Sequence, residues 1–119
     1  ASFIGSPAMN MIEGVMKGGM VEAGGARMPV PAGLKLAEGR EVIYGIRPEN
    51  LGLAAEGLSG TVAVVEPTGA ETHVVIRAAG RELTAVFRNR VSFAPGATIT
   101  LAPDAAVSHL FDKATGQRI

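Results

Sequence analysis

Glycine-rich turns constrain this chain more than any other feature of its sequence. Two glycine pairs, Gly18-Gly19 and Gly24-Gly25, lie close together, and the 119 residues contain 16 Gly and 7 Pro. Paired glycines accept the positive φ angles of tight hairpin turns, which most other residues avoid. Such frequent interruption favours many short strands over long helices. Residues 20–23 and 26–30 are therefore predicted to form a hairpin around the second pair.

Between the turns, apolar and polar residues alternate as they do in strands with one buried face. The clearest case is residues 82–88, where Leu83, Ala85 and Phe87 are predicted to face inward and Val86 outward. Further strands are expected over residues 9–17, 41–47, 61–66, 71–77 and 97–101, with a connection over residues 50–60 and a short helical turn capped by Asp104. Seven or eight short strands predict an all-β fold, an OB-like Greek-key barrel of short antiparallel strands with glycine-rich turns.

The bulk composition indicates one domain and excludes several classes of function. A length of 119 residues fits a single domain that can bury its own core. Eleven basic and eleven acidic residues give a formal net charge of zero, whereas nucleic-acid binders usually carry a basic excess. The absence of Cys excludes disulfides and thiolate chemistry. No apolar run approaches the roughly 20 residues that a membrane-spanning helix needs.

The sequence lacks the groups that catalysis would require. A phosphate-binding loop needs a Gly-x4-Gly-Lys-Ser/Thr segment, and none is present. The two histidines are 36 positions apart, and no Cys accompanies them as a metal ligand. His73 lies within a predicted strand among apolar neighbours, which favours a structural, hydrogen-bonded imidazole over a ligand. We therefore expect no catalytic, cofactor-binding or metal-binding residues in this chain, and no enzymatic activity.

Two features have both a structural and a functional interpretation. Arg47, Pro48 and Glu49 end a predicted strand, and the structural interpretation is a strand exit fixed by the proline. The functional interpretation is a contact with a neighbouring domain or subunit, because loop residues on rigid scaffolds often carry function. The five methionines lie in the first quarter of the chain. They are expected to fill the core, with an adaptable partner surface as the alternative.

Four stretches of the chain, taken in order, resemble one protein family. They are Phe3-Ile4-Gly5-Ser6-Pro7-Ala8-Met9-Asn10, Gly45-Ile46-Arg47-Pro48-Glu49-Asn50, Val64-Val65-Glu66-Pro67-Thr68-Gly69-Ala70-Glu71-Thr72 and His109-Leu110-Phe111-Asp112-Lys113-Ala114-Thr115-Gly116. Together they resemble the C-terminal regulatory domain, the OB-like TOBE region, of ATP-binding subunits of maltose-type carbohydrate ABC importers. The first and last stretches are most similar to the sn-glycerol-3-phosphate importer branch.

The resemblance implies a domain organisation and a set of partners. Residues 1–119 would form one regulatory domain, and residues 1–8 would connect it to an N-terminal ATPase domain that lies outside this sequence and binds ATP and Mg²⁺. Two such subunits would form a homodimer through this domain and would contact membrane-spanning permease subunits at the cytoplasmic side of the bacterial inner membrane. In some members a regulatory protein binds the same domain. The candidate interface or regulatory contacts are Arg47, Pro48, Glu49, Gly69, Glu71 and Phe111.

Two other functions are known for OB-like barrels. OB-like barrels of this lineage also bind sugars or oxyanions, so a small-ligand sensor is the alternative to a dimerisation domain. An oligonucleotide-binding domain is disfavoured by the neutral charge and by the scarcity of aromatic residues on which bases stack.

Overall fold

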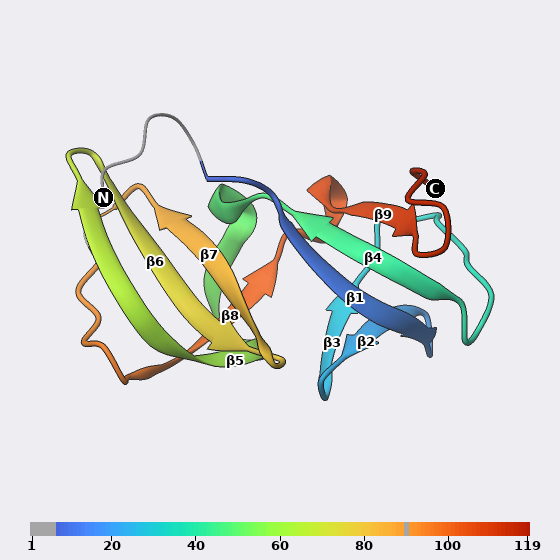
Figure 1. Cartoon of the computed structure of the whole chain (residues 1–119), viewed down its shortest axis with the longest axis horizontal. Helices are drawn as coiled ribbons and strands as arrows, with labels where there is room; N and C mark the ends of the chain where they lie inside the picture. Colours follow the sequence, from blue (N-terminus) through green and yellow to red (C-terminus); the bar gives the residue numbers. More distant parts are fainter. Residues whose placement is uncertain (1–6, 90) are drawn as a thin grey trace.

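The computed structural model describes residues 7–89 and 91–119 and is built from strands (Figure 1). Residues 1–6, most of the predicted connection 1–8, and Arg90 lie outside the described residues. The strands are β1 (Asn10–Lys17), β2 (Met20–Ala23), β3 (Ala26–Pro29), β4 (Glu41–Ile46), β5 (Leu51–Thr68), β6 (Glu71–Ala78), β7 (Arg81–Phe87), β8 (Thr98–Pro103) and β9 (His109–Asp112). Two short 3-10 turns, η1 (Pro48–Asn50) and η2 (Ala105–Val107), complete the described elements. The predicted all-β class is confirmed.

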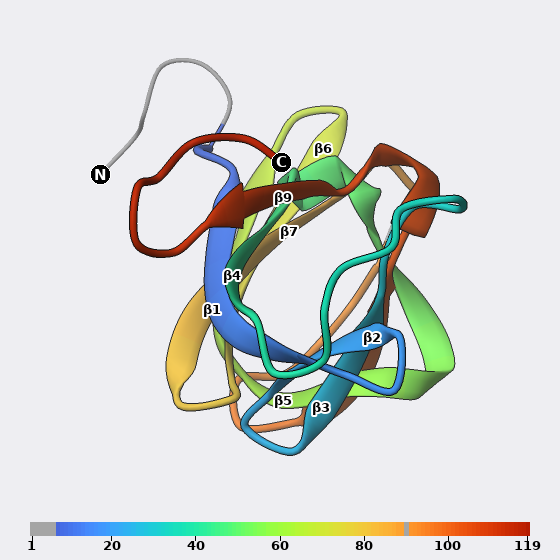
Figure 2. The same cartoon turned by 90° about the vertical axis from the view of Figure 1, so that its right-hand side faces the viewer.

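The strands form two antiparallel sheets that lie next to one another along the 42 Å long axis (Figure 1). The first sheet has the strand order β3-β2-β1-β4-β9, and the second has the order β7-β6-β5-β8. Strand β9 returns to pair with β4 after the whole second sheet has been formed. Viewed from one end, the strands of both sheets curve around a common interior (Figure 2). One hydrophobic cluster includes buried residues of both sheets.

Two-residue turns build the hairpins, as the glycine pairs predicted. Lys17 pairs with Met20, and Ala23 pairs with Ala26, so each glycine pair forms the complete turn. All four of these glycines have positive φ angles. The β6–β7 hairpin has the same length, but its first turn residue is Ala79, with φ of 55°. Ala79 is the one non-glycine residue with positive φ among the described residues.

The inward faces of β4 and of most of β7 match the predicted alternation. In β4, Val42, Tyr44 and Ile46 are completely buried, and the Tyr44 hydroxyl donates to the carbonyl oxygen of Pro29 (2.6 Å). Val86 was predicted to face solvent, and this prediction is wrong because Val86 is only 7% exposed. Turn η1 packs against β7, the strand that carries Val86. Strand alternation does not encode such a contact between distant segments, so it does not predict the burial of this edge strand.

The predicted connection over residues 50–60 is also wrong, because it forms the first part of β5. This strand has 18 residues and pairs with both β6 and β8. Its pairing with Leu101 shifts from Leu53 to Leu58, so the residues between them form a bulge. A Cβ atom on Gly60 would lie 2.6 Å from the carbonyl oxygen of Arg77 in β6, which explains why glycine occupies this strand position.

The two segments that connect the sheets lie against each other. Turn η1 leads from the first sheet to the second, and η2 leads back. The backbone N–H of Asp104 donates to the carbonyl oxygen of Asn50 (3.0 Å), which ties the two segments together. The Asp104 carboxylate accepts from the N–H of Ala106 (3.1 Å), so its predicted role as a cap is confirmed. Neither of these turns, the helical elements of the described chain, has the length to cross a bilayer.

Candidate interaction surface

The outer face of the first sheet carries a partly exposed apolar surface centred on Gly45. Met11 pairs with Gly45 across β1 and β4, and Ile43 pairs with Phe111 across β4 and β9. A Cβ atom on Gly45 would lie 2.7 Å from the sulfur of Met9, 3.0 Å from the Phe111 ring and 3.4 Å from the sulfur of Met11. Glycine therefore lets these three side chains converge. We call Met9, Met11, Ile43 and Phe111 the apolar strip.

Solvent reaches the apolar strip although it lies on a rigid sheet. Met11 is 46% exposed, and Val15, two residues beyond Glu13 on the same face of β1, is 40% exposed. Ile43 and Phe111 are half-buried. Methionine is flexible and polarisable, which suits a surface that must adapt to a partner. Contiguous exposed apolar groups on a sheet face are typical of interaction sites.

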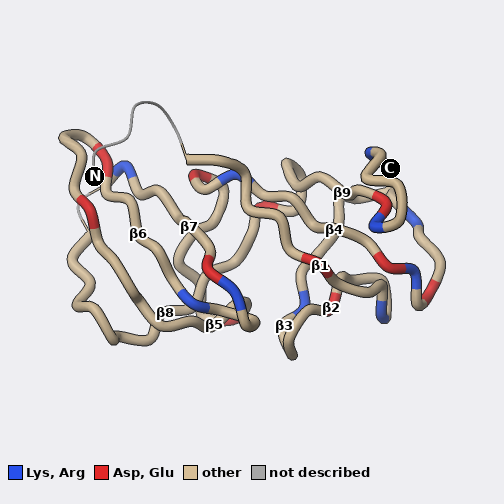
Figure 3. The backbone as a smooth tube through the Cα atoms, in the orientation of Figure 1, with Lys and Arg blue, Asp and Glu red and all other residues tan. Residues whose placement is uncertain are grey.

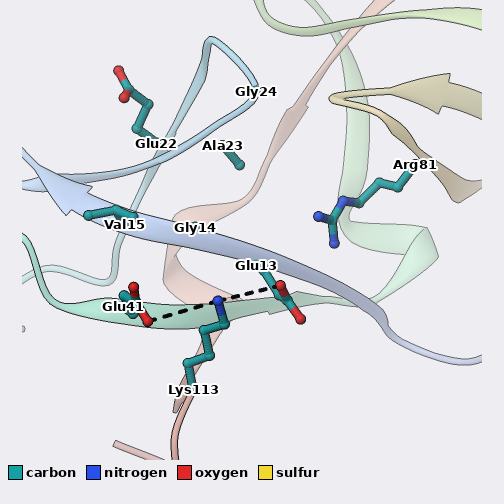
Figure 4. Close-up of a pocket in the computed structure, with 9 residues that line it drawn as sticks. All are labelled: Glu13, Gly14, Val15, Glu22, Ala23, Gly24, Glu41, Arg81 and Lys113. Atoms are coloured by element: carbon teal, nitrogen blue, oxygen red, sulfur yellow. Dashed lines mark ion pairs between the residues drawn. The ribbon is translucent and has the colours of Figure 1, made fainter.

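Charged side chains border the strip at the end near the β9 tail. The ammonium group of Lys113 lies 3.7 Å from Glu13 and 3.9 Å from Glu41, so it bridges β1 and β4 (Figure 4). Arg40 forms an ion pair with Asp112 (3.0 Å). The pKa of Asp112 is lowered, first by the hydrogen bond from the N–H of Thr115 and then by the bond from Arg40. These pairs hold the tail beside the sheet.

A cleft of about 270 Å³ lies next to these ion pairs, where the second sheet approaches β1 (Figure 4). Arg81, the first residue of β7, enters it and donates to the carbonyl oxygen of Met11 (3.4 Å). Lys113 and three carboxylates, those of Glu13, Glu22 and Glu41, also line the cleft. Because the carboxylates outnumber the cations, the cleft does not favour an anion. Within residues 7–89 and 91–119, no group of three His, Cys, Asp or Glu side chains is arranged to hold a metal ion.

Four of the six predicted contact residues belong to the first sheet or to its exit. Phe111 lies in the apolar strip. Arg47 follows β4 in an extended conformation, and it therefore continues the outer face of Ile43 and Gly45. Pro48 is buried as the first residue of η1, while Arg47 and Glu49 on either side of it are exposed. Arg47 and Phe111 thus lie on the outer face of the first sheet, and Pro48 and Glu49 follow in η1.

The other two predicted contacts lie apart from this surface. Gly69 forms the β5–β6 turn with φ of 76°, and Glu71 begins β6, both in the second sheet. Glu71 accepts a hydrogen bond from Nε2 of the buried His73 (3.2 Å) and lies 3.7 Å from Arg88. This pairing agrees with the predicted structural role of His73. Gly69 and Glu71 therefore form no common site with Arg47 and Phe111.

The sequence-based list missed most of the apolar strip. Strand alternation alone places Met11 opposite the buried face of β1, and Ile43 opposite the buried face of β4. An exposed Met on a strand carries no further signal, however, and Gly45 resembles a strand-weakening residue rather than the centre of a surface. The register that places Phe111 over Gly45 joins segments more than 60 residues apart. The distribution of charge does not mark this surface either, because acidic and basic residues are interspersed along both sheets (Figure 3).

Comparison with known proteins places this geometry in a family. The profile described as the MalK OB fold domain matches residues 5–51, and the profile described as the TOBE domain matches residues 44–111. An ABC transporter ATP-binding protein of Sinorhizobium fredii, y4oS, is 44% identical over 123 residues, covering 100% of this chain and 33% of the relative. The sn-glycerol-3-phosphate import ATP-binding protein UgpC of Cereibacter sphaeroides is 40% identical, covering 100% of this chain and 34% of the relative.

The chain thus spans about a third of the length of these relatives, and it corresponds to their C-terminal part. Among solved structures, the cytoplasmic molybdate-binding protein ModG has a similar fold, with a TM-score of 0.66 and 20% sequence identity. The similarity covers 87% of this chain and 95% of ModG. The OB-like architecture expected from the sequence is confirmed. Since the profile match covers more than half of its residues, the chain belongs to the TOBE domain family.

Proposed function

We propose that this chain is the dimerisation and regulatory domain of the ATP-binding subunit of an ABC importer for sugars or glycerol-3-phosphate. The whole subunit would bind ATP and Mg²⁺ through its upstream domain and would associate with permease subunits at the cytoplasmic face of the inner membrane. The relatives named as import ATP-binding proteins support this assignment. The domain itself would perform no catalysis. Its role would be to present a surface for contact with other subunits.

The apolar strip carries the proposal. Met11 projects from a rigid sheet face with 46% of its surface exposed, and Phe111 and Ile43 extend the same surface. A two-fold dimer uses the same patch on both copies, so one apolar strip is enough to form the centre of an interface. Regulation then requires only that one arrangement of the dimer is favoured over another, by about 1–3 kcal/mol.

Sedimentation of the chain and of two lysine variants tests the proposal. Met11→Lys places a charge in the centre of the strip, and we expect it to weaken the dimer by at least about tenfold, or about 1.4 kcal/mol. Val64→Lys is the matched control, since Val64 is 52% exposed but lies in β5 of the second sheet. A wild-type chain that sediments as a monomer at every concentration would contradict the proposal.

A small-ligand sensor is the second candidate, and two observations favour it. The ModG structure is described as molybdate-bound, and this chain has the same fold. The cleft at Arg81 and Lys113 offers both donors and acceptors, which suits a neutral polyol better than an anion. A thermal-shift screen with sugars, glycerol-3-phosphate, phosphate and molybdate tests this function. A concentration-dependent rise in Tm for one of them would support a sensor, and a silent screen would count against it.

A further inference from the structure

Two exposed, oppositely charged side chains flank the buried Pro48 at the exit of β4. Arg47 precedes the proline and Glu49 follows it. The backbone here is fixed, because the Arg47 carbonyl oxygen accepts from the N–H of Asn50 (2.9 Å) and Pro48 packs inside. Neither charged side chain forms a hydrogen bond or an ion pair with another residue in the described part of the chain.

Most of the other charged side chains in the first sheet form ion pairs with one another. Lys113 bridges two carboxylates, and Arg40 pairs with Asp112 at 3.0 Å. Lys17 lies 3.8 Å from Glu22 across β1 and β2. Arg47 and Glu49 differ from these pairs because the η1 turn exposes both of them to solvent, and neither has a partner within residues 7–89 and 91–119.

These two charges stand at one end of the apolar strip. Arg47 continues the outer face on which Gly45 lies, and the strip surrounds Gly45. Turn η2, which carries the 41% exposed Val107, is tied to η1 by the Asp104–Asn50 hydrogen bond. The η1 charges therefore form a polar border to the apolar surface, as the rim of an interface does.

We propose that Arg47 of one protomer pairs with Glu49 of a second copy of this chain, and that the same contact occurs twice across a two-fold axis. This inference rests on the proposed dimerisation. In a two-fold interface, if residue i contacts residue j, then j contacts i, so one Arg and one Glu yield two equal ion pairs. Such rim pairs fix the orientation and register of the two copies more than they add affinity.

Charge balance favours a second copy over a different partner. The turn carries one positive and one negative side chain, and the chain as a whole has a formal net charge of zero. A strongly basic or acidic partner would gain at one of the two side chains and lose at the other. An identical turn, rotated by two-fold symmetry, offers each charge its opposite. The short turn with Pro48 at its first position also holds both charges in place before binding.

A charge-reversal cycle measured by sedimentation tests the pairing. We expect Arg47→Glu and Glu49→Arg each to weaken the dimer by about tenfold, because each creates two like-charge contacts. The double variant Arg47→Glu/Glu49→Arg should recover association to within about threefold of wild type, since it restores both pairs with exchanged signs. Glu56→Arg, an exposed charge in β5 of the second sheet, is the control and should have no effect.

Disulfide trapping tests the same contact without relying on affinity. The chain has no Cys, so single-cysteine variants are unambiguous. A mixture of Arg47→Cys with a mass-tagged Glu49→Cys should form the mixed disulfide on mild oxidation, whereas Arg47→Cys with Glu56→Cys should not. Disulfides that form only between two copies of one variant would place the axis elsewhere and overturn the pairing.

The outcomes also separate this inference from the proposed function. If Met11→Lys abolishes the dimer but both single reversals leave it unchanged, the Arg47–Glu49 pairing is wrong and the dimerisation function stands. If the wild-type chain is monomeric, both fail. If the single reversals weaken the dimer and the double variant does not recover, the two residues belong to the interface but do not pair with each other, which also overturns the inference.

Discussion

The side-chain amide of Asn10 forms two hydrogen bonds with the backbone of Thr84 and so joins strands that belong to different sheets. Asn10 Oδ1 accepts from the N–H of Thr84 (2.8 Å), and Asn10 Nδ2 donates to the Thr84 carbonyl oxygen (2.9 Å). The same Nδ2 also donates to the carbonyl oxygen of Ile46 (3.2 Å). Strands β1 and β7 do not pair through their backbones, and one buried side chain connects them instead.

Replacing Asn10 by Ala should destabilise the chain by about 2–3 kcal/mol, because partly buried backbone groups of Thr84 lose their partners. Urea unfolding measures the loss. Amide hydrogen exchange of Thr84 should accelerate in the variant more than exchange in the centre of β6. Ser59→Ala, which removes an exposed hydroxyl contact with Thr100, is the control and should change stability by less than about 0.5 kcal/mol. Equal effects of the two substitutions would show that the amide contributes little to the stability of the contact between the sheets.

A methyl group at Gly60 should destabilise the fold, whereas one at Gly52 should not. Both glycines lie in β5, but a Cβ on Gly60 would lie 2.6 Å from a backbone oxygen of β6, while a Cβ on Gly52 meets nothing within 4 Å. We expect Gly60→Ala to cost about 1–3 kcal/mol and to separate β5 from β6 locally. Gly52→Ala should be neutral or slightly stabilising, since alanine restricts the unfolded chain. Thermal unfolding of both variants checks the difference.

Replacing Ala79 by Gly should stabilise the β6–β7 hairpin by about 1 kcal/mol, because Ala79 adopts φ of 55°, a conformation that costs an L-residue about 1–2 kcal/mol. Ala70→Gly offers a matched comparison in the β5–β6 turn, where the alanine has no positive φ. That substitution should leave stability unchanged or lower it. A lower Tm for Ala79→Gly would indicate that the contact between Ala79 and Gly24 matters more than the backbone strain.

The stability of the chain should decrease in acid in a way that depends on Asp112. Its folded pKa is lowered below the ordinary value of an aspartate by hydrogen bonds, first from Thr115 and then from Arg40. A lowered folded pKa contributes stability that is present above the unfolded pKa and is lost as pH falls through the folded pKa. Asp112→Asn should therefore flatten the acid limb of the curve of unfolding free energy against pH. An unchanged limb would assign acid sensitivity to other carboxylates.

The local parts of the fold were predictable from the sequence. The glycine-pair turns and the buried face of β4 follow from φ preferences and from period-2 alternation, both of which act over a few residues. The first part of β5 was not predictable. Its residues alternate poorly around a bulge, and pairing with β8, more than 40 residues later, makes them a strand. Propensity within a short window does not contain that information.

The candidate surface was predictable only in part, for the same reason. Phe111 and Arg47 come from stretches that resemble the family, and both lie on the outer face of the first sheet or at its end. Met11 and Ile43 join them only through the register of β1, β4 and β9. Val86 shows the opposite error, because local alternation exposes a residue that is buried in β7, the strand against which η1 packs.

The hydrogen bond between Asp104 and Asn50 has a consequence for how the chain can be divided. Residues 51–103 form the whole second sheet, and the groups at their two ends meet at 3.0 Å. The segment is therefore an insertion whose entry and exit lie side by side, so a change in its length need not alter the path of the host sheet. Truncation before β9 is different, because it removes an edge of the host sheet and uncovers Tyr44, the largest fully buried side chain.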